Sequence, residues 1–352
     1  MTITSSDAIP RPTKRSLKSI GLIIAKWGLF VAVLYYVIRY GVDQWKTLDL
    51  RNVHWSPGCL AAAMLVYFIS WIPAAWVWGE LLRSAGSKLR FYPLVRAHFC
   101  GHVGKYIPGK ALSLVIRAAL VREFDVPLSL SGLMATVETL ITMATGVIVT
   151  VVLLPLLIGQ ADTQGIATAL PVLTSVLEAP SWQRWTAAGL ILIFAITTIP
   201  IFTRLLAMAT KKLSRKIDPS STAELHLPYR TVGLWMLVIA GGWFLNGCSL
   251  GLVLLSVGIT PDLTNSPLLW TCAVAGATSL GFLVLFAPGG LGVREAILIG
   301  FLQLSPQIDA SFAVVAAVLL RVISFLSEIL FTLLLYSVSG KRVRKPESEN
   351  GD

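Results

Sequence analysis

Long apolar runs, separated by short polar segments, make up most of the chain from about residue 19 onward. Each run reaches or exceeds roughly 18 residues, the length at which a helix can cross a membrane. The pattern therefore predicts an all-α polytopic membrane protein with about six full spans. We expect these spans at about 19–39, 57–80, 129–158, 185–206, 229–257 and 309–338.

Two further apolar segments, at about 91–121 and 266–303, are each interrupted by a Pro-Gly pair. Proline lacks a backbone N–H and clashes with the preceding turn, while glycine permits the chain to reverse. Irregular backbone at membrane depth is tolerated only where protein or a water-filled cavity surrounds it. We therefore expect two re-entrant helical hairpins; if their arms cross fully instead, the chain has roughly eight or more spans. The residues expected to shape the breaks are Pro108, Gly109, Pro288, Gly289, Gly290 and Gly292.

The two breaks resemble each other, which indicates a duplicated unit. Their prolines are 180 positions apart, each has an aromatic residue two positions before it, and each is followed by an arginine, Arg117 or Arg294. In the expected topology the first hairpin is entered from the cytoplasmic face and the second from the outer face. Halves at about 57–158 and 229–338 would then form an inverted-topology repeat, an arrangement that many transporters share.

Composition supports a membrane location. The chain is 55% hydrophobic and only 13% charged, with a mean hydropathy of +0.75, whereas a soluble domain carries about 25% charged residues. The net charge of +11 comes from lysines and arginines that are shared among short loops. This distribution favours a membrane protein over one that binds nucleic acid.

The basic residues also predict an orientation, because they gather on one side of the expected topology. We expect a cytoplasmic basic tail at 1–18, a transmembrane domain at 19–338 and a cytoplasmic polar tail at 339–352. The positive-inside rule then places both termini in the cytoplasm. We expect the chain to be a multi-pass protein of the cell (plasma or inner) membrane. No small-residue cleavage signal follows the first apolar run, so we expect it to be retained as a span.

Charged residues in or beside the apolar segments are the main candidates for function. Each costs roughly 2.5–3.5 kcal/mol at the centre of a span, so a partner or an aqueous cavity must stabilise it. Basic residues around the breaks would suit a phosphate head group, and Glu138 and Glu295 would neutralise them in the empty state or contact an amine or sugar. The alternative is a set of ion pairs that lock the hairpins, such as Arg117–Glu138 or Glu295–Arg321. The candidate substrate-binding residues are Lys105, Tyr106, Lys110, Arg117, Glu138, Arg294, Glu295 and Arg321.

Other reactive side chains indicate no catalytic or metal site. The four cysteines lie in apolar segments and lack metal-binding spacings. His98 and His102 are interpreted as residues at the membrane interface near a basic loop, and the tryptophans late in the second span, among them Trp78, are placed at the interface as well. The sequence contains no nucleophile elbow, P-loop or HExxH motif. We expect no catalytic residue, no metal and no cofactor.

Both breaks carry motifs of a known family. The stretch from Gly104 to Lys110, GKYIPGK, continues to Arg117 and resembles the "GKYxPGK…R" signature of the lysylphosphatidylglycerol synthase transmembrane region, also called the flippase-like domain family. The stretch APGGLGVRE is similar to the "aPGGlGvRE" signature of the same family. Glu138 and Arg321 fall where the family carries an intramembrane glutamate and a basic residue. The resemblance covers about 20–338.

The chain departs from the family pattern at two positions. Thr139 and Thr142 stand where relatives carry the arginine of a Glu-Arg pair and an acidic residue four positions on. An identical polar network is therefore not expected.

The resemblance implies lipid translocation. In the multiple peptide resistance factor, the resembling region moves aminoacylated phosphatidylglycerol between leaflets, and other relatives are linked to polyprenyl-phosphate sugars in cell-surface glycosylation. The long form carries a soluble aminoacyltransferase domain after its spans. Only a short tail follows the last expected span here, so we expect no lysylphosphatidylglycerol synthesis.

The leading hypothesis is a lipid transporter of the flippase or scramblase type that moves a phosphate-bearing lipid, a phospholipid or a polyprenyl-phosphate lipid. The alternatives are an intramembrane transferase acting on a lipid-linked substrate, and an accessory subunit of an envelope glycosylation complex. Nucleic acid is not an expected partner. Assembly into a homo-oligomer or with an envelope-biosynthesis partner stays open.

Overall fold

The computed structural model of the chain describes most of the expected transmembrane domain. The described residues are 35, 39, 42, 55–106, 111–122, 124, 126–158, 180–217, 228–259, 266–283, 292–305 and 308–339. The Pro-Gly centres of both breaks lie outside these residues, as do both expected tails and the first expected span except for residues 35, 39 and 339. In the described part of the chain, every regular element is a helix.

The helices follow the order of the apolar runs. Their bounds are α2 Pro57–Ser70, α3 Ile72–Ser84, α4 Phe91–Val103, the short 3-10 helix η2 Gly104–Tyr106, α5 Ala111–Arg122, α6 Leu128–Ile158, α9 Ser181–Ile217, α10 Tyr229–Ser256, α11 Ser266–Leu283, α12 Val293–Leu302 and α13 Ala310–Ser339.

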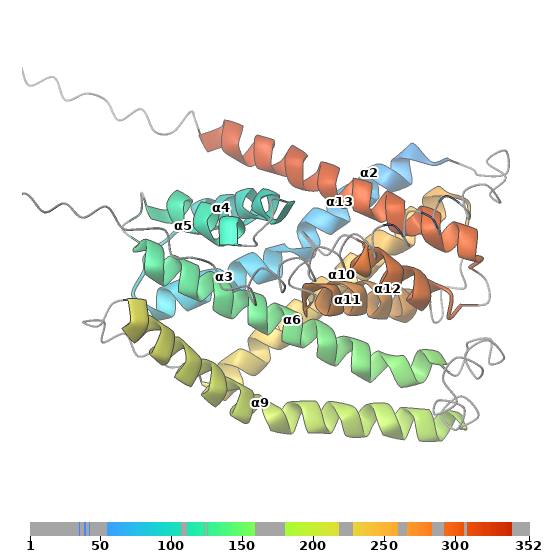
Figure 1. Ribbon diagram of the computed structural model, residues 1–352, viewed down its shortest axis with the longest axis horizontal. Helices are drawn as coiled ribbons and strands as arrows, with labels where there is room; N and C mark the ends of the chain where they lie inside the picture. Colours follow the sequence, from blue (N-terminus) through green and yellow to red (C-terminus); the bar gives the residue numbers. More distant parts are fainter. Residues whose placement is uncertain are drawn as a thin grey trace, which may run out of the picture.

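Five of the expected spans correspond to described helices that are long and apolar enough to cross a membrane. These stretches are Pro57–Ser84, Leu128–Pro155, Ser181–Lys212, Tyr229–Ser256 and Ala310–Ser337. The first of them combines α2 and α3, which meet at Trp71 because a proline follows two positions later. Helix α9 contains Pro200 and bends along its length in Figure 1, as a proline inside a helix predicts.

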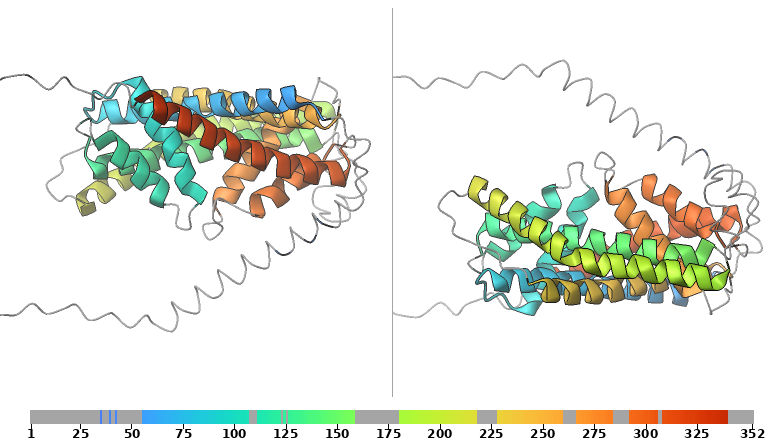
Figure 2. Two further views of the ribbon diagram at one scale, coloured as in Figure 1. Left: turned by 90° about the horizontal axis from the view of Figure 1, so that it is seen from above. Right: turned by 90° about the horizontal axis from the view of Figure 1, so that it is seen from below.

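The helices form an elongated bundle (Figure 1) in which α6, α9 and α13 run along the long axis. The short helices α4 and α5 lie toward one end of the bundle, and α11 and α12 lie toward the other end; Figure 2 shows the same separation from above and below. Within each pair the two helices pack on each other. The two pairs of short helices therefore lie toward opposite ends of the bundle.

Helices of the N-terminal half of the chain pack on helices of the C-terminal half. Helix α11 packs on α6, which belongs to the other half, and α4 likewise packs on α13 of the other half. Helices α2 and α10, which open the two halves, pack on each other. Side chains on two helices fix α2 in place, because Ser249 of α10 donates to the backbone oxygen of Ala63 at 2.9 Å and Ser327 of α13 donates to that of Met64 at 2.9 Å.

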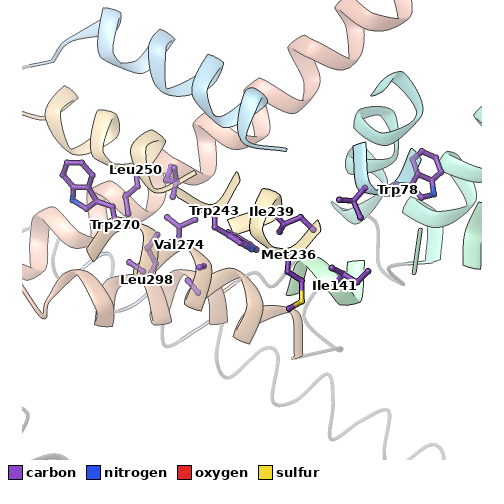
Figure 3. Packing of buried hydrophobic residues seen from close by; sticks show 14 of the residues in the cluster. Trp78, Ile141, Met236, Ile239, Trp243, Leu250, Trp270, Val274 and Leu298 are labelled. Atoms are coloured by element: carbon purple, nitrogen blue, oxygen red, sulfur yellow. The ribbon is translucent and has the colours of Figure 1, made fainter. Parts of the chain in front are cut away.

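Helix α10 occupies the centre of the core. Figure 3 shows Trp243 of α10 between two groups of buried side chains, with Leu250, Trp270 and Val274 to one side and Met236 and Ile239 to the other. The Trp243 indole N–H donates to the backbone oxygen of Thr142 at 3.2 Å, which joins α10 to α6.

Two glycines allow α10 and α11 to approach each other closely. A Cβ at Gly247 would meet the Thr271 backbone at 2.7 Å, and a Cβ at Gly251 would meet the Trp270 ring at 2.2 Å. Small residues four positions apart are a common contact surface between membrane helices because they let the backbones come together. By contrast, a Cβ at Gly241 of the same helix would meet nothing within 4 Å.

Substituting Gly247→Ala should therefore destabilise the protein. The added methyl group must displace the backbone of α11, and overpacking of this kind costs about 1–3 kcal/mol. Thermal unfolding in detergent, followed by circular dichroism, measures the effect.

Gly241→Ala is the matched control. It should be neutral or stabilising, because alanine is about 0.5–1 kcal/mol better than glycine inside a helix. Equal shifts in the melting temperature of the two variants would show that the contact between α10 and α11 at Thr271 is not as tight as described.

Candidate functional site

A partly open cavity of about 420 Å³ lies where the two pairs of short helices converge. Its walls come from Trp71, the C-terminal end of α4, η2, the start of α5, the middle of α6, the C-terminal end of α11 and the start of α12. The polar residues that line it are Trp71, His102, Lys105, Ser113, Arg117, Thr136, Glu138, Thr139, Thr142, Thr278 and Arg294.

Four of the candidate residues line this cavity, namely Lys105, Arg117, Glu138 and Arg294. They come from both halves of the chain, so the fold brings together charges that lie far apart in the sequence. Of Tyr106 the structure describes the backbone only, as the last residue of η2. The remaining candidates Lys110, Pro108, Gly109, Pro288, Gly289 and Gly290 lie outside the described residues.

The first charged group joins α5 to α6. Arg117 Nη1 donates to Glu138 Oε2 at 2.7 Å, and the Thr142 hydroxyl donates to Glu138 Oε1 at 3.0 Å. Both charged side chains are buried. The Arg117 guanidinium also lies over the Trp78 ring, 5.7 Å from its centroid, where the negative face of the indole adds attraction. This is one of the two ion pairs that the sequence analysis named.

The second charged group joins η2 to α13 and was not predicted. Lys105 Nζ forms an ion pair and a hydrogen bond with Glu328 Oε1. The Tyr67 hydroxyl, on α2, donates to the same oxygen at 2.6 Å. Glu328 is 1% exposed, and its other oxygen is buried without a hydrogen-bond partner. Glu328 lies within an apolar run of the sequence, which is typical of an intramembrane charge, but its spacing does not indicate its partners.

Two buried histidines lie between these groups. His98 Nε2 is 4.0 Å from Glu138 Oε1, and His102 Nδ1 is 3.7 Å from Glu328 Oε1. Their rings are 4.8 Å apart between centroids. The prediction that they lie at the membrane interface is wrong, because both are buried inside the bundle. Their spacing of four residues, one helical turn, places both on the face of α4 that turns inward.

The interface prediction is also wrong for Trp78 of α3. Trp78 is fully buried, where it covers Arg117. Trp71, at the junction of α2 and α3, stands edge-on to the His102 ring with 5.0 Å between centroids. These indoles therefore pack around the charged groups of the cavity.

The third charged group stabilises the start of α12. Gly292 has φ +83°, a conformation that glycine adopts readily. Its N–H donates to Glu295 Oε2 at 2.7 Å, so the glutamate caps the helix that it opens. Arg321 Nε of α13 is 3.6 Å from Glu295 Oε1. Glu295 and Arg321 thus form the second ion pair named from the sequence, and neither lines the cavity.

Arg294 differs from the other cations of this region. It is buried and lines the cavity, but it forms no ion pair with any carboxylate in the described part of the chain. Arg117, Lys105 and Arg321 are each matched by one glutamate. The described cavity region therefore carries a surplus positive charge, which Arg294 supplies.

Among the described residues, no group of three or more histidine, cysteine or acidic side chains has the geometry to hold a metal ion. The four cysteines are free thiols. The basic and apolar side chains that line the described cavity can attract an anion and hold apolar groups.

The sequence matches a family model described as "Lysylphosphatidylglycerol synthase TM region" over residues 14–331. A UPF0104 membrane protein of Methanothermobacter thermautotrophicus is 28% identical over 131 residues, which are 37% of this chain and 35% of that protein. A UPF0104 membrane protein of Methanocaldococcus jannaschii is 33% identical over 109 residues, 31% of this chain and 44% of that protein. The matched stretches span less than half the length of either relative.

Removing one partner of the Arg117–Glu138 pair should destabilise the fold strongly. Glu138→Gln leaves a buried guanidinium without its counter-charge, which costs about 3–5 kcal/mol, whereas replacing both partners, with Arg117→Met added, should recover much of that loss. Unfolding of the variants in mixed micelles of increasing denaturing detergent gives the coupling free energy.

The Glu80–Arg83 pair on α3 provides the control, since both of its side chains are about a third exposed. Glu80→Gln should change the free energy of unfolding by only about 0–1 kcal/mol. A coupling energy for Arg117 and Glu138 as small as that of the exposed pair would contradict the described burial.

Proposed function

Since the chain belongs to the lysylphosphatidylglycerol synthase transmembrane region family, we propose that it is a lipid transporter that moves a phosphate-bearing lipid between the leaflets of the membrane. The cavity between the two pairs of short helices holds the polar head group. The lipid is an aminoacyl-phospholipid or a polyprenyl-phosphate sugar. The proposal rests on the charge and shape of the cavity together with the family.

The surplus cation Arg294 is the observation that carries this proposal. A buried charge without a partner is costly, so a structural role would favour a nearby carboxylate. An incoming phosphate supplies that missing charge. A guanidinium suits it well, because its planar fork donates two parallel hydrogen bonds to phosphate oxygens. Lys105 and Arg117, on the opposite wall, complete a basic site, and Glu138 balances the charge when the cavity is empty.

The remaining wall of the cavity is apolar, as a lipid requires. Leu114, Leu140, Met143 and Phe282 line it. Leu140 lines the cavity and is 42% exposed, which supports a cavity that opens toward the bilayer. The acyl or polyprenyl chains can then remain in the membrane while the head group passes through the cavity.

The short helices support re-entrant hairpins. Helices α4, α5 and α12 have 13, 12 and 10 residues, so at 1.5 Å per residue each covers ~15–20 Å, less than the ~30 Å hydrocarbon core. Helix α11 is longer, with 18 residues. Helix α11 packs on α6 and α4 packs on α13, so a short helix of each half contacts a long helix of the other half. This arrangement favours an inverted repeat. Alternating access would arise from one half moving against the other around the shared cavity.

The protein resides in the plasma or inner membrane, and its basic loops favour an orientation with both termini in the cytoplasm. The hairpin of α4 and α5 then opens to the cytoplasm, and that of α11 and α12 opens to the outside.

An intramembrane transferase remains the alternative function, and an accessory subunit of an envelope complex is a third. The family match covers a transmembrane region, which supports a transporter. A transferase would convert the lipid, and an accessory subunit would move none on its own, so one reconstitution experiment distinguishes the three functions.

The proposed topology predicts which sides of the membrane reach the ends of the hairpins. In a variant whose native cysteines are replaced by alanine, single cysteines at Tyr92 and Phe124, near the two ends of the first hairpin, should react with an impermeant maleimide from the cytoplasmic side. Cysteines at Leu268 and Gln303 should react from the outer side. Labelling of Tyr92→Cys and Phe124→Cys from opposite sides would mean that α4 and α5 cross the membrane separately.

Lipid movement should depend on Arg294. Proteoliposomes are prepared with acyl-labelled phosphatidylglycerol, lysylphosphatidylglycerol or a labelled polyprenyl phosphate, and the label in the outer leaflet is destroyed by an impermeant reductant. Arg294→Gln should slow the movement of the transported lipid about tenfold or more, because a hydrogen bond to a charged group contributes about 1.5–3 kcal/mol.

Arg204→Gln is the control, since Arg204 is exposed on α9 and is not among the residues that line the cavity. It should move lipid at the wild-type rate. The proposal fails if none of the lipids moves faster than in protein-free vesicles, or if Arg294→Gln and the wild type move lipid equally fast.

A further inference from the structure

His102 lies beside the Lys105–Glu328 pair and does not belong to the proposed phosphate site of Lys105, Arg117 and Arg294. His102 lines the cavity, and its Nδ1 is buried without a hydrogen-bond partner. The nearest charged atom of Glu328 is 3.7 Å away. A proton on Nδ1 would therefore place a positive charge next to the buried, ionised carboxylate of Glu328.

We propose that His102 is a proton-binding site that is coupled to the cavity and takes up one proton when a phosphodiester anion binds. This inference rests on the proposed function, because it assigns the ion that accompanies the lipid head group. It identifies the proton as the co-substrate of transport.

The coupling follows from the charge around Glu328. In the empty state its carboxylate is matched by Lys105, and a neutral His102 leaves the three groups without net charge. Lys105 is accessible, with 25% of its side chain exposed, whereas the Glu328 side chain is 1% exposed. An anion at Arg294 attracts the Lys105 ammonium across the cavity. Glu328 then loses its counter-charge unless another cation replaces it.

A proton on His102 Nδ1 supplies that cation without any movement of the backbone. The imidazolium would donate toward Glu328 Oε1, while the Tyr67 hydroxyl keeps its own bond to that oxygen. One anion and one proton enter together, so the net charge of the site is unchanged. The proton comes from water in the cavity.

The other titratable and charged groups around His102 lie on α4, α5, α6, α12 and α13. His98 lies next to it on α4, Arg117 on α5 and Glu138 on α6 are paired with each other, and the nearest indole is that of Trp71. Arg294 on α12 faces the cavity, and Arg321 on α13 is paired with Glu295.

His98 is the natural comparison for His102. It is one turn away on the same helix and also lies near a glutamate, with both ring nitrogens lacking hydrogen-bond partners. It is fully buried and is not among the residues that line the cavity. Its carboxylate, Glu138, keeps Arg117 and Thr142 as partners. A proton reaching the site through the cavity therefore meets His102.

Proton uptake by the wild-type protein is the first test. Dimethyl phosphate is the probe, because this diester carries one negative charge throughout the pH range used. Added to the purified full chain in weakly buffered detergent solution near pH 7.5, it should cause uptake of up to one proton per diester bound, read with a pH-sensitive dye. Binding without proton uptake, or no binding at millimolar probe, would overturn the inference.

The fluorescence of Trp71 is the second test, because it reports the protonation of His102. An imidazolium next to an indole quenches its fluorescence, so the wild-type emission should fall as the pH is lowered, and dimethyl phosphate should shift the midpoint of this fall to higher pH. Trp71→Phe and His102→Gln should each remove the change, and His98→Gln should retain it. A change that persists in His102→Gln or disappears in His98→Gln would contradict the assignment.

The pH dependence of lipid movement is the third test. It uses the labelled lipid that moves in the reconstitution experiment. Lowering the pH from 8 to 6 should speed its movement by up to about tenfold per pH unit, as linkage to one proton requires, and His102→Gln should reduce this dependence to less than twofold over the whole range. Lipid movement that is equally independent of pH in both proteins would overturn the inference but leave the proposed function standing. Proton uptake with dimethyl phosphate in a protein that moves none of the lipids would overturn the proposed function alone.

Discussion

A charge that is buried away from water must be neutralised, and this constraint determines how the two halves of the protein meet. The interrupted segments carry Lys105, Arg117 and Arg294 to the cavity, and glutamates on α13 and α6 compensate the first two. These pairs join η2 to α13 and α5 to α6, beside the cavity at which α4, α5, α11 and α12 converge. Packing of apolar side chains alone would not select this arrangement, since lipid is as apolar as the helix surfaces.

The sequence allowed contacts to be predicted only between helices that follow each other along the chain. Apolar length predicted five described spans, because hydropathy reports directly on the cost of placing a segment in a bilayer. The pairs Arg117–Glu138 and Glu295–Arg321 could also be named, since each joins a short helix to the helix that follows it. Lys105–Glu328 could not, because its residues are 223 positions apart. Only the packing of α4 against α13 brings them together.

The histidines and Trp78 show where a general rule failed. Aromatic and basic residues near the end of an apolar run do favour the membrane interface, and that rule placed them there. It assumes that each helix presents these residues to lipid head groups. Helix α4 is short and turns its His98–His102 face inward, so both rings lie among carboxylates, while Trp78 covers the Arg117 guanidinium. A buried cation recruits the aromatic side chain because the ring face replaces part of its lost hydration.

The three ion pairs have unequal roles in any relative motion of the two halves. Arg117–Glu138 joins α5 to α6, and Glu295–Arg321 joins α12 to α13, so each pair holds a short helix to its own half. Lys105–Glu328 is different, because it joins η2 of the first half to α13 of the second. A motion that opens the cavity to one side and closes it to the other can keep the first two pairs but must strain the third. Lys105 is also the cation of the three that lies most open to the cavity, so an anion there competes with Glu328 for it. The ion pair that joins the two halves is thus the pair that a bound head group weakens, and this relation couples occupancy of a site to movement around it.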